Sequence, residues 1–355
     1  MSWFNEENVN DKDYVLEVVE NDAGALEFAS PDMRNDKDVV LAAISKSGYA
    51  LAYASDELRN DKDVVFAAVS HNGGALQYAS DELKNDKEIV FKAVSQNDLA
   101  FCYASPELQN DKDIVLKAAE KNGYILDDIS PELRNDKDIV LAAVSHDGWA
   151  LQYASPELQN DKDVVLKAVE NNGRALEYAS DELRNDKDVA LKAVGENGYA
   201  LMFASAELKN DRDVVFKAVE NDGMALQFAS DILKNDKSIA LKAIDQTGYA
   251  LGSASPELRN NKDVVLKAVS QCWCALEDAS PELQNDEDVK AVVESQKAVM
   301  ERAVSEAFWN EHAIVVTPEE EDQIIDDEDK EHDNDGDRGD DGDDIGDDDP
   351  GDIGD

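Results

Sequence analysis

The sequence has only three cysteines in 355 residues, Cys102, Cys272 and Cys274, too few and too unevenly placed for a disulfide framework. It also lacks a basic start followed by an apolar core, the pattern of a signal peptide. No apolar run approaches the roughly 18–20 residues that a membrane helix needs. We therefore expect an intracellular protein, cytoplasmic or nuclear, with reduced thiols and no membrane partner.

Basic and aromatic residues are scarce as well. Lysine and arginine number 34 against 81 aspartate and glutamate, which gives a net charge of −47. Residues 319–355 hold 21 acidic residues against Lys330 and Arg338, or −19, so the rest of the chain carries −28. Such a surface repels nucleic acid and anionic lipid and favours a basic protein partner. Aromatics, at 6%, fit thin layers of small aliphatic side chains.

No pattern of catalytic, cofactor or metal-binding residues is visible. A phosphate loop, a dinucleotide fingerprint and a nucleophile–base pair are all missing. Cys272 and Cys274 supply only half of a zinc site. The tail stretch EHDNDGDRGDDGDD resembles the calcium-binding loop of an EF-hand, but Gly342 occupies the position at which a bidentate acidic ligand is expected. We therefore expect no enzyme and no cofactor, and we read residues 317–355 as an acidic disordered tail.

A 25-residue period dominates what is present. The stretch ASPELQNDKDVVLKAVENNG, residues 154–173, recurs along the chain with few substitutions, and Asn160 has counterparts from Asn10 to Asn285. Asn160 is predicted to cap a helix with Asp163 as the capping-box acid. The apolar residues of VVLKAV form one face of this helix. Gly173 is predicted to end it in the left-handed conformation.

A second, shorter helix is expected in segments such as WALQYA, residues 149–154, where flanking caps outweigh the alternating pattern. The recurring serine is followed by proline in six repeats, and proline is favoured at the first position of a helix. Each repeat is therefore predicted to contain a helix, a short helix and a Ser-capped turn.

Because one such unit cannot bury its own apolar face, the repeats must stack. The predicted fold is all-α: a superhelical α-solenoid, right-handed or of unspecified hand, of about eleven 25-residue repeats. Stacking at roughly 8–10 Å per helix gives a length of about 100 Å. The expected parts are a lead-in (1–9), the repeats (10–285), a C-terminal capping helix (286–316) and the tail (317–355).

The residue after the glycine varies while its neighbours are nearly constant. It favours types that are enriched at interface hot spots. We call the following residues of this column the aromatic stripe, the candidate partner-binding site: Tyr49, Tyr124, Trp149, Arg174, Tyr199, Met224 and Tyr249. Either the rings project in line and bind a partner, or each packs over the corner of the next repeat. Rings that are more than about a third exposed favour binding.

The unit ALxYASxELxNDKDVVLxAVxxNG, over about residues 10–295, resembles the tandem repeats called domain of unknown function 4116. The resemblance implies helical repeats with an interaction role and brings no catalytic residues. The sequence thus favours a non-catalytic scaffold that binds a protein along the stripe. The alternative is a charge-driven acidic chaperone or nucleic-acid mimic for basic proteins, and a third reading is a spacer without a partner.

Overall fold

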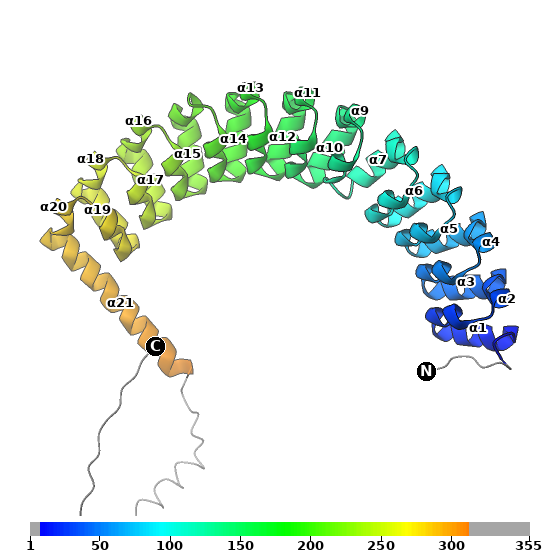
Figure 1. Ribbon diagram of the computed structural model, residues 1–355. Helices are drawn as coiled ribbons and strands as arrows, with labels where there is room; N and C mark the ends of the chain where they lie inside the picture. The colour runs from blue at the N-terminus through cyan, green and yellow to red at the C-terminus, as the bar shows by residue number, and fades with distance from the viewer. Residues whose placement is uncertain (1–7, 312–355) are drawn as a thin grey trace, which may run out of the picture. The chain divides into compact units, whose positions relative to one another are not determined.

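The computed structural model describes residues 8–311, and every regular element in this range is a helix. The chain divides into two compact units, Met1–Lys297 and Ala298–Asp355. The first unit holds the repeats, which follow one another in a curved row (Figure 1). The all-α prediction is confirmed for the described residues.

Each repeat contributes three helices in a constant order. The long helices are α1 (Lys12–Asn21), α3 (Lys37–Lys46), α5 (Lys62–His71), α6 (Lys87–Gln96), α7 (Lys112–Ala119), α10 (Lys137–His146), α12 (Lys162–Asn171), α14 (Lys187–Glu196), α15 (Arg212–Asn221), α17 (Lys237–Gln246) and α19 (Lys262–Gln271). The corner helices, all 3₁₀ except α8, are η1 (Ala23–Phe28), η2 (Gly48–Tyr53), η3 (Gly73–Tyr78), η5 (Asp98–Tyr103), α8 (Ile125–Asp128), η7 (Gly148–Tyr153), η8 (Gly173–Tyr178), η9 (Gly198–Phe203), η11 (Gly223–Phe228), η12 (Gly248–Ser253) and η13 (Trp273–Asp278).

A one-turn helix then returns the chain to the next repeat. These turn helices are α2 (Pro31–Arg34), α4 (Asp56–Arg59), η4 (Leu83–Asn85), η6 (Leu108–Asn110), α9 (Pro131–Arg134), α11 (Pro156–Gln159), α13 (Asp181–Arg184), η10 (Leu208–Asn210), α16 (Asp231–Lys234), α18 (Pro256–Arg259) and α20 (Pro281–Gln284). The final helix, α21, runs from Glu287 to Glu311. The predicted tail, 317–355, lies outside the described residues, as do 312–316 of the expected capping helix.

The long helices begin one residue later than the sequence suggested. Asp161, in extended conformation, caps α12 by accepting hydrogen bonds from the backbone N–H groups of Asp163 and Val164. Asn160 instead ends the preceding turn helix α11. The prediction that Asn160 caps the helix is therefore wrong. Either residue type can cap a helix, but the asparagine amide is already bonded to the next repeat.

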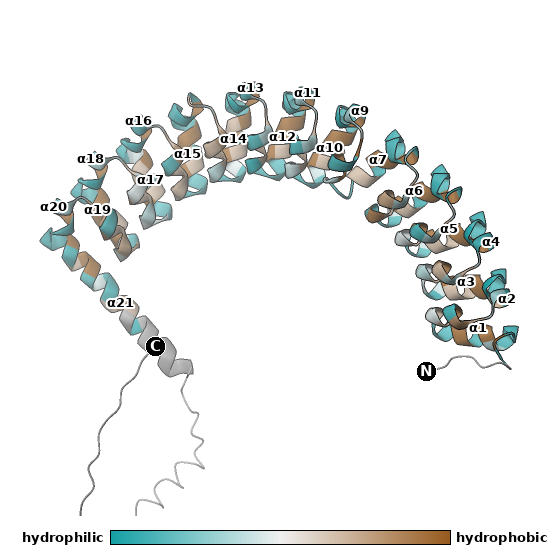
Figure 2. Ribbon diagram, viewed as in Figure 1, coloured by the Kyte–Doolittle hydropathy of each residue, from teal (hydrophilic) through white to brown (hydrophobic). Residues whose placement is uncertain are grey.

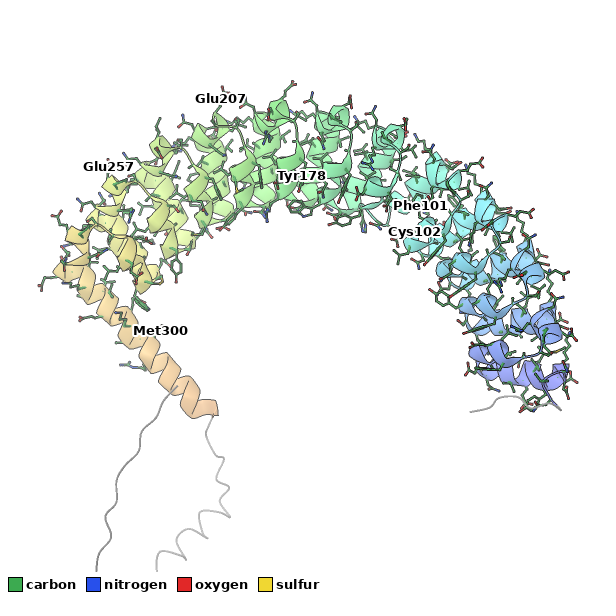
Figure 3. The ribbon with its side chains drawn as sticks, in the orientation of Figure 1. Phe101, Cys102, Tyr178, Glu207, Glu257 and Met300 are labelled. Atoms are coloured by element: carbon green, nitrogen blue, oxygen red, sulfur yellow. A yellow bond between two sulfur atoms is a disulfide. The ribbon has the colours of Figure 1, made fainter. Side chains whose placement is uncertain are left out.

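The core is one continuous layer that runs through all repeats. On α12 the residues Val164, Val165, Ala168 and Val169 are fully buried, as the predicted apolar face requires. Figure 2 shows hydrophilic residues on the turn helices along the outer edge of the row, and Glu207 and Glu257 project from this edge in Figure 3. Each helix therefore buries its apolar face only against its neighbours, as expected for stacked repeats.

The recurring glycine permits a close approach between repeats and does not supply a left-handed cap. None of the glycines in residues 8–311 adopts a positive φ. A Cβ on Gly173 would lie only 2.3 Å from the carbonyl oxygen of Ala193 in the next repeat. The left-handed prediction is therefore wrong, because the constraint comes from the neighbouring helix and not from the local backbone.

Three repeats lack this glycine. Asp98 accepts a hydrogen bond from Asn122, which follows α7, and α7 is two residues shorter than the other long helices. Trp273 precedes α21, which continues as one helix of 25 residues where a corner would otherwise form. Ala23 lies in the first of the described repeats, and the repeat that follows it has a long helix of standard length. An altered neighbour therefore accompanies the loss of the glycine at Asp98 and Trp273 but not at Ala23.

The serine-capped turn is confirmed. The hydroxyl of Ser155 accepts the backbone N–H of Leu158, and Pro156 occupies the first position of α11. The second short helix is also present, as a 3₁₀ helix of six residues at most corners. Its tighter winding places residues three apart on one side.

Polar bonds join each repeat to the next. The backbone N–H of Ser180 donates to Gln159 O (2.9 Å), and its hydroxyl donates to Oδ1 of Asn160. Farther along the repeat, Lys162 Nζ lies 2.8 Å from the cap residue Asp186 and 3.2 Å from Asp188. The motif NDKD therefore contributes both helix caps and ion pairs across the repeat boundary.

One corner departs from this pattern. At residues 125–128 the 3₁₀ helix is replaced by the α-turn α8, within the sequence ILDDIS. In the described part of the chain, Ser130 makes neither bond to the preceding repeat, although Lys112 still pairs with Asp136 at 2.7 Å. The stack is therefore least connected at this corner.

Replacing Asp161 with alanine is expected to lower the free energy of unfolding by about 1–2 kcal/mol, because two backbone N–H groups lose their acceptor. Asp161→Asn is expected to cost less than about 1 kcal/mol, since an amide oxygen can still cap and exposed ion pairs contribute little. Asn261 provides the precedent, accepting from Val264 N at 3.3 Å. Urea denaturation followed by circular dichroism measures both values. Equal costs would show that the charge, and not the cap, carries the effect.

Candidate interaction surface

The residues of the aromatic stripe occupy the second position of a 3₁₀ corner helix, except Tyr124, which directly precedes α8. In five of the seven, the side chain of the residue two positions earlier accepts the backbone N–H of the stripe residue; Tyr49 and Tyr249 lack this bond. Asn197 holds Tyr199 in this way at 2.9 Å, and Asn172 holds Arg174 at 3.0 Å. The backbone of the stripe is therefore set by the repeat, while the side chain is free to differ.

Four of the five rings of the stripe pack edge-on against an aromatic residue of the next repeat; for Tyr249 the corresponding residue is Asp278. Ring centroids lie 6.3 Å apart for Tyr49–Tyr78, 6.2 Å for Tyr124–Tyr153, 5.7 Å for Trp149–Tyr178 and 5.6 Å for Tyr199–Phe228, with interplanar angles of 66–84°. Such T-shaped pairs are favourable for aromatic rings. These four rings are thereby held against the following corner helix.

The same rings remain accessible. Tyr49 is 41% exposed, Tyr124 and Tyr249 are each 53% exposed, and Tyr199 is 36% exposed. Trp149 and Met224 are half-buried, whereas Arg174 is exposed. Packing and exposure are therefore compatible in this column, because a ring can pack over the next corner along one edge and still present a face to solvent.

A second row of rings borders the stripe, and its sequence pattern predicted only a short helix. Its members share the sixth position of the 3₁₀ corner helices: Phe28, Tyr53, Tyr78, Tyr103, Tyr153, Tyr178, Phe203 and Phe228. We call this set the second aromatic row. The signal that could have identified it is the concentration of tyrosine, because nine of the ten tyrosines lie either in the stripe or in this row.

The stripe has natural limits. Toward the N-terminus it is interrupted at Gly74, against which the Tyr49 hydroxyl lies, and at Leu99. From Tyr124 to Tyr249 each of six successive repeats carries a large side chain in the column. Arg174 lies over the Trp149 ring, with its guanidinium carbon 5.5 Å from the ring centroid. These six repeats form the longest unbroken stretch of the candidate surface.

Acidic groups surround the rings. The charged residues of the corner helices are Glu27, Asp98, Asp127, Asp128, Glu177, Glu277, Asp278 and, as the single base, Arg174. Burial and the nearby Glu27 raise the pKa of Tyr53, and burial and Glu177 raise the pKa of Tyr178. Both phenols therefore remain hydrogen-bond donors at neutral pH, within a negatively charged environment.

The cysteines do not match the sequence-based expectation of reduced thiols. The sulfurs of Cys272 and Cys274 are bonded to each other, which also removes the proposed half of a zinc site, since a disulfide provides no thiolate. Cys274 occupies the stripe column, and its Sγ lies 3.1 Å from the Tyr249 hydroxyl. Cys102 is free and exposed, and it lies on the inner edge of the row in Figure 3.

Other surface features are less regular. A groove of about 990 Å³ crosses the long helices α5, α6 and α7 at Phe66, Phe91 and Leu116, with lysine and acidic side chains around it. In residues 8–311 no cluster of three or more histidine, cysteine or acidic side chains is arranged to hold a metal ion. The calcium-loop-like stretch of the tail lies outside this range. No described helix is long and apolar enough to cross a membrane.

Comparison with known proteins connects this architecture to one family. The chain matches the family described as Domain of unknown function (DUF4116) in nine overlapping segments: residues 11–59, 61–109, 88–134, 111–159, 136–184, 161–209, 186–234, 211–259 and 236–284. Neither the curated proteins nor the solved structures contain a match. Each segment spans about two repeats, so the family unit is a pair of stacked neighbours. The chain therefore belongs to the DUF4116 family of tandem helical repeats.

Proposed function

We propose that this protein is a non-catalytic scaffold that binds a partner protein along the aromatic stripe. The observation that carries this proposal is the combination of exposure and fixation in the stripe rings. Tyr124 and Tyr199 present ring surface to solvent while each is packed edge-on against the next repeat.

Fixation favours binding because an immobilised side chain has less conformational entropy to lose when a partner arrives. Tyrosine, tryptophan and arginine are also the residues that most often dominate binding energy at interfaces. Five of the six adjacent repeats from Tyr124 to Tyr249 offer such side chains, and Met224 is the sixth residue, so a partner can contact several of them at once.

The charge of the chain supports a second candidate, in which affinity for basic proteins comes from bulk electrostatics and not from surface shape. A net charge of −47, of which −19 lies in residues 319–355, attracts any basic partner over a long range. In this case the protein acts as an acidic chaperone or nucleic-acid mimic, and the identity of the stripe residues has little effect.

The triple substitution Tyr124→Ala, Trp149→Ala and Tyr199→Ala is expected to weaken partner binding at least about 100-fold, because hot-spot residues contribute about 2 kcal/mol or more each. Partners are captured on immobilised full-length protein and identified by mass spectrometry, and the affinity of each is then measured with purified components. The double substitution Phe66→Ala and Phe91→Ala is the matched control, since these rings are 37% and 41% exposed but lie on long helices.

Deletion of 317–355 separates the two candidates further. A partner that binds through the stripe stays bound to the truncated protein and in about 0.5 M salt, where surface charges are strongly screened. If deletion or salt abolishes binding while the triple substitution leaves it unchanged, the stripe is not the binding site and the charge-driven function is supported.

A further inference from the structure

We propose that the stripe from Tyr124 to Tyr249 binds an extended, proline-rich segment that carries basic residues, one three-residue turn of polyproline II helix per repeat. This inference rests on the proposed function and specifies the chemistry of the partner.

The spacing of the repeats favours this ligand. Neighbouring repeats touch through small residues, with Gly173 directly against the Ala193 carbonyl, so their separation matches that of close-packed helices, roughly 8–10 Å. A polyproline II helix advances about 3.1 Å per residue with three residues per turn, or about 9.3 Å per turn. Every third residue of such a ligand therefore faces the stripe residue of the next repeat.

Hydrogen bonding favours the same ligand. Between Tyr124 and Tyr249 the stripe and the second aromatic row together contain eight rings, and all but the two phenylalanines are polar at the tip: Tyr124, Trp149, Tyr153, Tyr178, Tyr199, Phe203, Phe228 and Tyr249. The polyproline II backbone has no internal hydrogen bonds, so its carbonyl groups are free to accept from phenol and indole donors. An α-helical ligand has already used most of its carbonyls internally and offers few acceptors.

Charge also favours a basic ligand. Between Tyr124 and Tyr249 the corner helices carry three carboxylates, Asp127, Asp128 and Glu177, and a single base, and Asp127 and Asp128 are exposed beside Tyr124. Basic side chains between the prolines of a ligand would meet these groups. Arg174 already shows that a guanidinium can lie over a stripe ring, at 5.5 Å from the Trp149 centroid. Lysine or arginine of a partner can make the same cation–π contact at rings that lack such a neighbour.

Fluorescence anisotropy with labelled synthetic peptides tests the inference on the full-length protein at about 0.15 M salt. The probe is (Pro-Pro-Lys)₆, whose 18 residues extend about 56 Å, the length of six repeats. Three controls change one property each: (Gly-Ser-Lys)₆ keeps the charge and removes the stiffness, (Pro-Pro-Glu)₆ reverses the charge, and a basic amphipathic helix with leucine at every seventh residue replaces the conformation.

The probe is expected to bind at least about 10-fold more tightly than (Gly-Ser-Lys)₆ and the helical peptide, and (Pro-Pro-Glu)₆ is expected not to bind. The stripe triple variant loses this preference, whereas Phe66→Ala with Phe91→Ala keeps it. Shortening the probe to (Pro-Pro-Lys)₃ is expected to weaken binding by a larger factor than shortening (Gly-Ser-Lys)₆ to (Gly-Ser-Lys)₃. The second comparison measures the effect of the lost charge alone.

Equal binding of the two basic peptides overturns the inference in favour of charge alone, and tighter binding of the helix overturns it in favour of a helical ligand. Absence of binding by every peptide also overturns it. In each case the proposed scaffold function is judged separately, because the captured partner still loses affinity for the triple variant if the stripe binds a protein of another kind.

Discussion

Gly173→Ala is expected to lower the free energy of unfolding by about 3 kcal/mol, at the upper end of the usual cost of overpacking. The new Cβ would lie 2.3 Å from the Ala193 carbonyl oxygen and 3.0 Å from Asn197 N, both backbone atoms that cannot rotate away. To relieve this contact, two repeats must separate, and the buried layer between α12 and α14 opens with them. The midpoint of urea unfolding, followed by circular dichroism, measures the loss.

Gly195→Ala provides the control for this substitution. Gly195 lies in α14, and a Cβ there would meet only the Lys217 side chain, at an ordinary 3.6 Å. Because alanine has the higher helix propensity, this variant is expected to be as stable as the natural sequence or more stable by up to about 1 kcal/mol. If both alanine variants had the same stability, the close approach of the repeats would not be the reason for the glycine.

Acid is expected to unfold the repeats cooperatively below about pH 4. Ten of the aspartates that cap long helices or α21 have a lowered pKa: Asp36, Asp61, Asp86, Asp111, Asp136, Asp161, Asp186, Asp211, Asp236 and Asp286. At Asp186 burial alone would raise the pKa, but Lys162 and two backbone N–H groups outweigh burial and lower it.

A carboxylate whose pKa is lower in the folded state stabilises the fold above its unfolded pKa, near 4, and this stability is lost as the pH falls through the folded value. The lysine partners behave in the opposite direction. The aspartates bonded to Lys162 raise its pKa, so its contribution is present below about pH 10.5 and is lost only as the pH rises through the higher folded value. The stability of the stack is therefore expected to be high between these limits and to fall most steeply on the acid side.

Urea midpoints at pH 7, 5, 4 and 3 test this expectation in the natural sequence and in the triple variant Asp161→Asn, Asp186→Asn and Asp211→Asn. The variant keeps an oxygen acceptor at each helix start, as Asn261 does naturally. It is expected to be somewhat less stable at pH 7 but to lose less stability between pH 7 and pH 3. Parallel pH profiles for the two proteins would show that these carboxylates do not control acid unfolding.

Each 25-residue repeat contains constant positions, which maintain the fold, and a variable position in the stripe. Constant residues cap helices, bond to the next repeat and permit its close approach, as Asp161, Ser180 and Gly173 do. The stripe position is held by backbone bonds that do not depend on its side chain, as at Tyr199. Its chemistry can therefore change from repeat to repeat without loss of the fold, which is the property that a modular binding surface requires.

Two predictions failed for a common reason. Asn160 and Asp161 are both competent caps, and the choice depends on the bond between Asn160 and Ser180, 20 residues away. Glycine after a helix most often indicates a left-handed backbone, and the actual constraint is the Ala193 carbonyl of another repeat. Within a single repeat, neither competing interaction is visible.

The amino-acid sequence by itself determined the period, the apolar face of the long helix and the Ser–Pro turn, because these follow from side-chain spacing and backbone preferences within a few residues. Only the tertiary structure decided the pairing of Lys162 with Asp186 and Asp188, the reason for Gly173, and the packing and exposure of the stripe rings. These features join residues 20 or more positions apart, and their energies exist only once one repeat lies against the next.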